Sequence, residues 1–153
     1  YINMINPTAA HKDPSRSFDA AARKASRGQD FTGVLGCCAE NDVGVIAIRV
    51  LAAGAIIGEF KHYKDRIVTK DTDVDDVKFK AEAIKELLGD SQGTLAQAAI
   101  RFVLAHPEIA CVNFGAGTLH DLEDGVAAIE MGPLPDDVMA RLDDLYQSDF
   151  SRN

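Results

Sequence analysis

The chain alternates short runs of β-branched and other apolar residues with longer stretches in which apolar positions recur every three or four residues. The short runs predict three β-strands, at Tyr1–Ile5, Val43–Ile48 and Ile109–Phe114. The second run is almost continuous in apolar residues, which is typical of a parallel strand buried on both faces by helices. We therefore expect the three strands to be parallel neighbours in one sheet.

The longer stretches predict amphipathic helices, some with recognisable ends. Gly89 is suited to end one helix, and Thr94 with Gln97 has the spacing of a capping box at the start of the next. Pro135 is favoured at the first position of a helix. The predicted helices are Phe31–Ala39, Val74–Leu88, Leu95–Ala105, Thr118–Glu130 and Pro135–Tyr146, with long loops at Ala9–Asp30 and Gly58–Thr72.

This order of elements predicts an α/β fold. A chain of 153 residues without a linker-like segment is expected to fold as one unit, residues 1–153. Three strands are too few to close a barrel, and about five are expected in a doubly wound sheet from a chain of this length. The chain is therefore interpreted as part of a larger fold, and because Tyr1 lies inside a predicted strand, we expect the true beginning to lie upstream.

The charge of the chain argues against two classes of partner. Sixteen Lys and Arg stand against 24 Asp and Glu, giving a net charge of −8. An acidic surface repels nucleic acid backbones and anionic lipid heads, so neither nucleic acid nor membrane binding is expected. The sequence has no apolar run of about 18 residues and no signal-peptide pattern at its start, so a cytoplasmic location is the default expectation.

The cysteines and histidines are not spaced as metal ligands. The three cysteines, Cys37, Cys38 and Cys111, are expected to be reduced thiols packed as small hydrophobes. The histidines show neither an i, i+4 pair nor an HExxH motif, so no metal site is expected and they are assigned to the surface. They are His11, His62, His106 and His120. The acidic runs Asp71–Asp76 and Asp121–Asp124 are interpreted as solvated faces and helix N-terminal charges.

Small residues directly follow two of the predicted strands. Ile109–Phe114 continues into Gly115-Ala-Gly-Thr118 and then a helix, an arrangement whose backbone N–H groups and helix dipole suit a phosphate. The segment is neither a GxGxxG motif nor a Walker loop, and an ordinary strand-to-helix turn also needs small residues, so both interpretations stay open. A similar segment, Ile48–Gly54, follows the preceding strand, and two such turns on parallel strands would lie at the same end of a barrel, where ligands bind.

Arg49 stands at the end of a predicted buried strand, where a charge needs a partner. It would either contact an anion or substrate, or form a structural ion pair. The sequence contains no GxSxG motif and no other complete catalytic constellation.

Four segments together resemble the C-terminal half of the aldo-keto reductases. They read YINMINPT, NDVGVIAIRVLAAGAI, TLAQAAIRFVLAHPEIACVNFGAGTLHDLEDGVAAIE and LPDDVMARLDDLY, and they cover nearly the whole chain apart from the two predicted loops. The resemblance implies part of an eight-stranded (β/α) barrel, of the TIM type, in which the three predicted strands would be the sixth, seventh and eighth.

The resemblance further implies an NAD(P)-dependent carbonyl oxidoreductase, with NADP or NAD as cofactor and a small carbonyl compound as substrate. The family's Tyr general acid and its Asp, Lys and His partners would lie upstream of Tyr1, so this chain would supply cofactor binding and would alone be inactive. The segment after the seventh strand would flank the nicotinamide and pyrophosphate through Ile48, Arg49, Leu51, Ala53 and Gly54. The segment after the eighth strand would flank the adenosine end through Gly115, Ala116, Gly117, Asp121, Asp124 and Gly125.

The sequence departs from the family pattern at several of these positions. Ile48 stands where an aromatic residue often stacks on the nicotinamide, and Gly125 replaces an Asn that holds the adenine. Gly117 and Asp121 stand where basic residues meet the adenosine phosphate. Because Arg and Lys offset the desolvation of the 2′-phosphate of NADP, the resemblance implies that NADP loses its usual advantage over NAD here.

Two functions from different classes follow. In the first, the chain is the cofactor-binding half of an aldo-keto reductase and is completed by the remaining part of the barrel. In the second, it is a half-barrel interaction module without redox chemistry that covers its open sheet edge with another copy of itself.

Overall fold

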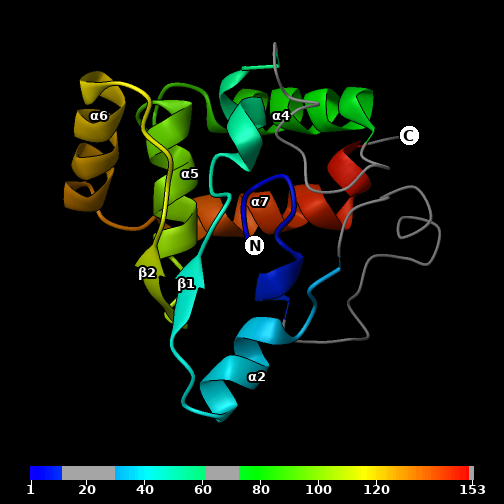
Figure 1. Cartoon of the computed structure of the whole chain (residues 1–153). Coiled ribbons are helices and arrows are strands. Elements are labelled where there is room, and N and C mark those ends of the chain that lie inside the picture. The colour runs from blue at the N-terminus through cyan, green and yellow to red at the C-terminus, as the bar shows by residue number, and fades with distance from the viewer. Residues whose placement is uncertain (12–29, 61–72, 152–153) are drawn as a thin grey trace.

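The computed structural model describes residues 1–11, 30–60 and 73–151, which form an α/β fold with a small parallel sheet. Strand β1 (Val45–Ala47) lies beside strand β2 (Ile109–Val112) (Figure 1). Val45 is opposite Ile109 and Ala47 opposite Val112, with an irregularity in register after Val45. The parallel pairing predicted for the second and third apolar runs is therefore confirmed, although both strands are shorter than predicted.

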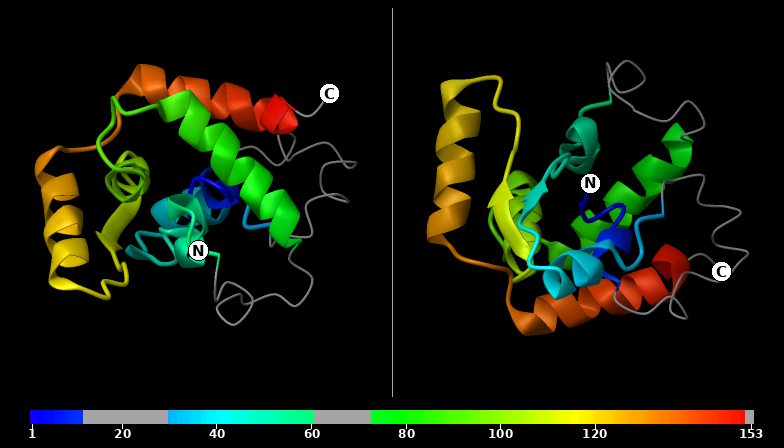
Figure 2. Two further views of the ribbon diagram at one scale, coloured as in Figure 1. Left: turned by 90° about the horizontal axis from the view of Figure 1, so that it is seen from above. Right: turned by 60° about the horizontal axis from the view of Figure 1, so that its bottom comes forward.

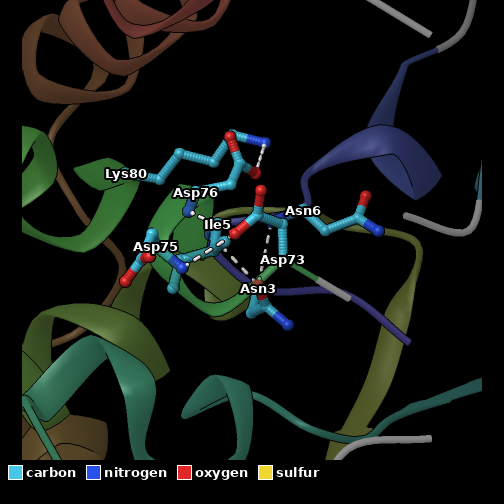
Figure 3. A network of polar contacts seen from close by, with 7 residues as sticks. All are labelled: Asn3, Ile5, Asn6, Asp73, Asp75, Asp76 and Lys80. Carbon is cyan, nitrogen blue, oxygen red and sulfur yellow. Dashed lines mark hydrogen bonds and ion pairs between the residues drawn. The ribbon is translucent and has the colours of Figure 1, made fainter. Parts of the chain in front are cut away.

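The prediction of a strand at Tyr1–Ile5 is wrong. This segment forms a tight turn whose only β feature is an isolated antiparallel bridge between Asn3 and Asn6. The Asn3 side chain explains the turn, because its Oδ1 accepts hydrogen bonds from the backbone N–H groups of Ile5 and Asn6, at 3.0 and 2.9 Å (Figure 3). Side-chain bonds of this kind compete with sheet pairing for the backbone.

The expectation that β1 is buried on both faces is also wrong. Ala47 is only 1% exposed, whereas the side chain before it, Ile46, is 63% exposed. Helix α5 (Leu95–Leu104) packs against β2, while Cys111 of β2 is exposed like Ile46 of β1. The continuous apolar run therefore leaves one face of the strand accessible.

The five predicted helices are all present. They are α2 (Val34–Glu40), α4 (Val74–Leu88), α5, α6 (Leu119–Glu130) and α7 (Asp136–Gln147). The described residues also include three short 3₁₀ segments, η1 (Thr8–Ala10), η3 (Ala52–Ile57) and η4 (Asp149–Ser151). Helix α2 begins later than predicted because Gly33 takes a left-handed φ of 85°. The predicted loops at 9–30 and 58–72 lie largely outside the described residues.

Helix α5 packs against α6, β2 and η3. Figures 1 and 2 show β2 and α6 beside it, with α4 and α7 on its other side. Its buried residues include Ala99, Phe102 and Val103, and its N-terminus carries the predicted Thr94–Gln97 capping box. The N-terminal turn also lies inside the molecule, since Ile2 and Met4 are 2% and 0% exposed.

Candidate functional site

A cleft of about 640 Å³ opens at the carboxyl ends of the two strands. The strands end together, because the N–H of Asn113 donates to the carbonyl oxygen of Ala47 at 2.9 Å. One wall comes from the segment after β1 and the other from the segment after β2, while Ala96 and Ile100 of α5 line the cleft between them. The two small-residue segments therefore lie side by side, as predicted.

The residues that the family resemblance assigns to the cofactor lie around this cleft, with the exception of Ala116. Those that line it are Ile48, Arg49, Leu51, Ala53, Gly54, Gly115, Gly117, Asp121, Asp124 and Gly125. Ala116 is exposed and does not line the cleft. Thr118, which the sequence already placed in the predicted anion-binding turn, also lines it, whereas Ile57, Glu59, Asn113 and Phe114 line it without having been assigned to a ligand from the sequence.

The wall after β1 is a turn with several left-handed residues. Arg49, Ala52 and Ala53 have φ of 61°, 49° and 59°, and Gly54 has φ of 94°. L-residues avoid this region, and each such residue costs on the order of 1 kcal/mol unless its surroundings hold it. Of these residues only Gly54 carries a sequence signal for the conformation, so the turn could not be predicted in detail.

The wall after β2 contains the predicted anion-binding turn, and its N–H groups already have an acceptor. Oδ2 of Asp121 accepts from the N–H groups of Gly117 and Thr118, at 3.0 and 2.9 Å. The Thr118 hydroxyl accepts in return from the N–H of Asp121 at 3.1 Å, which completes a capping box. Of the two interpretations left open by the sequence, the structure favours the helix-capping turn at these two amides.

The same contacts act on the Asp121 carboxyl group. Hydrogen bonds with the Thr118 side chain, and then with the backbone of Gly117 and Thr118, hold the pKa of Asp121 below its ordinary value. The group is fully exposed, so solvent screens its charge. Asp121 is therefore ionised at neutral pH and places a negative charge at the edge of the cleft.

Asp124 joins α6 to the start of α5. Its Oδ2 accepts from the Thr94 hydroxyl and its Oδ1 from Nε2 of Gln97, both at 2.7 Å. The residues of the α5 capping box are thus also the residues that fix Asp124 in the cleft wall. Charge-assisted hydrogen bonds of this kind are stronger than neutral ones, so this side of the cleft is well ordered.

Among the described residues that line the cleft, Arg49 carries the only positive charge. Glu59, Asp121 and Asp124 carry negative charges. Arg49 lies two residues beyond the end of β1, is half-buried and lines the cleft. The first wall therefore carries one charge of each sign, from Arg49 and Glu59, whereas the second wall carries the two negative charges of Asp121 and Asp124.

Gly125 makes room for an aromatic ring. A Cβ atom built at this position would lie 2.2 Å from Cζ and 2.5 Å from Cε2 of Phe114. The Phe114 ring thus packs directly on the backbone of α6, in the place that a side chain at position 125 would fill. This contact explains why position 125 requires glycine.

Replacing Gly125 with alanine should destabilise the chain by about 1–3 kcal/mol, the usual cost of overpacking, because the Phe114 ring must move. Chemical denaturation measures the change in the free energy of unfolding. The double variant Gly125→Ala/Phe114→Leu should lose less than the sum of the single variants, since leucine leaves space for the new methyl group. If the losses in the free energy of unfolding were additive, the contact between position 125 and the Phe114 ring would be contradicted.

Several expectations about cysteine and histidine need correction. All three cysteines are free thiols as predicted, but Cys37 and Cys111 are exposed rather than packed inside, because they lie on the outer sides of α2 and β2. His106 is half-buried, with its ring edge-on to Phe102 at 5.0 Å between centroids. His11 is also half-buried, His120 is exposed, and His62 lies outside the described residues.

The described residues contain neither a candidate metal-binding cluster nor a candidate membrane-spanning helix. No group of three or more His, Cys, Asp or Glu side chains in them is placed to hold a metal ion. Their helices also lack the length and apolar character needed to cross a membrane.

The model of the aldo/keto reductase family matches residues 24–147 of the chain. No curated protein matches it.

Proposed function

The chain belongs to the aldo/keto reductase family, and from this premise we propose that its cleft binds a nicotinamide dinucleotide for an NAD(P)H-dependent carbonyl oxidoreductase. One observation carries the proposal, which is that the positions assigned to the cofactor by the family resemblance, all except Ala116, line one cleft. Its volume, about 640 Å³, falls within the range typical of ligand sites. The small residues of both walls allow the backbone to approach an extended ligand closely.

The wall after β1 would hold the nicotinamide and the pyrophosphate. Ala53 and Gly54 leave space for the chain of the dinucleotide, and the Arg49 charge would stabilise the pyrophosphate. Ile48, which is 46% exposed, would offer an apolar side chain to the nicotinamide in place of the aromatic residue common in the family. Contact with an aliphatic side chain lacks ring stacking, so the nicotinamide would be held less firmly.

The wall after β2 would hold the adenosine end. Phe114 offers a ring there, and the carboxylate of Asp124, fixed by Thr94 and Gln97, offers acceptors to a ligand amino group. Asp121 stands at the same wall with a negative charge and with the turn amides already bonded to it. These contacts favour an unphosphorylated adenosine ribose, so NADP would have no advantage over NAD.

The bound dinucleotide would supply the hydride, and a small aldehyde or ketone would accept it. By the family resemblance, the proton donor and its partners belong to strands that precede the described sheet. The residues of this chain would orient the cofactor and exclude water, which lowers the barrier through positioning rather than through acid catalysis.

We also propose that these strands are the seventh and eighth of an eight-stranded barrel, completed by the family's remaining strands or by a second copy of the chain. Apolar residues that are exposed on β1 and α6 support this, among them Ile46 at 63%, Leu119 at 70% and Ile129 at 59%. Such exposed apolar patches mark interaction surfaces. Sedimentation of the chain alone distinguishes the two alternatives. A dimer that the double variant Leu119→Glu/Ile129→Glu converts to a monomer indicates a second copy, whereas a wild-type monomer favours completion by the family's remaining strands.

Titration of the 153-residue chain with NADH, followed by fluorescence, tests the cofactor proposal. Gly115→Leu is expected to weaken binding at least tenfold, because Gly115 lines the cleft and an added Cβ there meets no atom of the protein within 4 Å. Gly36→Leu is the matched control, since Gly36 is equally open but lies on α2, away from the cleft. The proposal would be contradicted if the wild-type chain showed no saturable NADH binding, or if Gly115→Leu and Gly36→Leu lost NADH affinity equally.

A further inference from the structure

The left-handed turn of the cleft wall is held from outside by one buried side chain. Asn3 is 1% exposed, and its Nδ2 donates to the carbonyl oxygen of Arg49 at 3.0 Å. The same carbonyl oxygen accepts from the N–H of Ala52 at 2.8 Å. Both lone pairs of this carbonyl are thus used, one by the turn itself and one by a residue far away in the sequence.

The orientation of the Asn3 amide is fixed by its other partners. Its Oδ1 accepts from the N–H groups of Ile5 and Asn6, at 3.0 and 2.9 Å, as Figure 3 shows. A reversed amide would place its NH₂ against two N–H donors and its oxygen against a carbonyl. Because the oxygen is held in this way, the NH₂ group can only point toward Arg49, and the amide joins the N-terminal turn to the cleft wall.

The turn needs such a support. Three non-glycine residues, Arg49, Ala52 and Ala53, have positive φ, and this conformation persists only where surrounding contacts hold it. The N-terminal turn supplies a second contact, from the N–H of Ile2 to the carbonyl oxygen of Ile48 at 3.5 Å. Arg49 and Ala53 line the cleft, so the shape of this wall depends on the support.

We propose that Asn3 is a positioning residue, which holds the segment 49–54 in the conformation that binds the nicotinamide and pyrophosphate half of the dinucleotide. This inference rests on the proposed function of the cleft. Asn3 does not line the cleft, so it acts through the Arg49 carbonyl group rather than through the ligand. Without the hydrogen bond from Asn3 to the Arg49 carbonyl oxygen, the turn populates other conformations. The apparent affinity for the dinucleotide then falls in proportion to the fraction of molecules whose turn keeps the binding geometry.

Three variants separate this role from general stability. Asn3→Asp keeps an acceptor for the Ile5 and Asn6 amides but loses the donor to Arg49, and Asn3→Ala loses both. Asn6→Ala is the control, because Asn6 lies in the same turn and its Oδ1 accepts from the hydroxyl of Thr8 at 2.7 Å instead. The free energy of unfolding of each variant is measured alongside.

The first measurement needs no ligand. Hydrogen exchange of the Ala52 amide, which bonds to the Arg49 carbonyl oxygen, is expected to become about tenfold faster in both Asn3 variants and to stay unchanged in Asn6→Ala. Unchanged exchange in the Asn3 variants would overturn the proposal, and this outcome does not depend on whether the cleft binds a dinucleotide.

The second measurement compares two ligands. Both Asn3 variants are expected to raise the Kd for NADH about tenfold and to change the Kd for AMP less than twofold, because AMP occupies only the adenosine end. An equal loss of affinity for NADH and for AMP would show that Asn3 has a merely structural role and would overturn the proposal. If the wild-type chain binds neither ligand, the proposed function fails, while the exchange measurement still decides whether Asn3 holds the turn.

Discussion

Replacing Lys80 with alanine is expected to lower the free energy of unfolding by about 3 kcal/mol. Lys80 is 7% exposed, and its Nζ lies 2.9 Å from Oδ2 of Asp76, one turn earlier on α4 (Figure 3). The ammonium group also lies 5.3 Å from the centre of the Phe150 ring. Truncation leaves the Asp76 carboxylate, whose side chain is only 15% exposed, without this partner in a poorly solvated place. Thermal unfolding should show a Tm lower by about 6–12 °C.

The neighbouring pair on the same helix provides the control. Lys78 lies 3.5 Å from Asp75, but these side chains are 50% and 93% exposed, so water screens their attraction. Because Lys78 Nζ also lies 5.6 Å from the centre of the Phe60 ring, Lys78→Ala should change the free energy of unfolding by up to about 1 kcal/mol, well below the loss in Lys80→Ala. The double variant Asp76→Asn/Lys80→Met should recover much of the loss, because it removes both charges together. An equal loss in Lys78→Ala and Lys80→Ala would show that burial of the pair has no importance.

The helices could be predicted from the sequence because their ends are determined locally. The α4 helix runs from Val74 to Leu88 as predicted, since Asp73 caps its start and Gly89 follows its end. The Thr94–Gln97 capping box likewise needs only residues three apart. Signals of this range are independent of the rest of the fold.

The N-terminal segment could not be predicted in the same way. Alternating apolar residues at Ile2 and Met4 fit a strand, and both are indeed buried. The backbone between them nevertheless follows the hydrogen bonds of the Asn3 side chain, which reach to Arg49 in a distant segment. Periodicity reports which side chains are inside, but it does not report which acceptor a buried amide will find.

The candidate site likewise has features that could be predicted from the sequence and others that depend on contacts between distant segments. Small residues after two strands were sufficient to predict which segments meet at the cleft, because parallel strands end at one edge of the sheet. The partners inside each wall depend on three-dimensional contacts. That Asp121 takes the turn amides, and that Phe114 fills the space beside Gly125, follow only from the geometry of α6 against β2.

Changing Asp121 to arginine is expected to shift the ratio of NADPH to NADH affinity about ten- to hundredfold toward NADPH. The wild-type carboxylate repels a 2′-phosphate and holds the amides of Gly117 and Thr118, whereas arginine removes the repulsion and offers bidentate donors. Wild-type affinities for the two reduced cofactors should be similar. Parallel fluorescence titrations at one ionic strength give both ratios.

Two control variants show whether the position of the charge matters. Asp121→Asn removes the negative charge but can still accept from the turn amides, so it should shift the ratio less than arginine does. Glu123→Arg makes the same change of charge two residues further along α6, outside the cleft lining, and should leave the ratio within about twofold because exposed charges are screened. Equal shifts in Asp121→Arg and Glu123→Arg would assign the effect to the overall charge of the chain. A wild-type preference for NADPH beyond about a hundredfold would mean that a basic group reaches the phosphate from outside the described cleft.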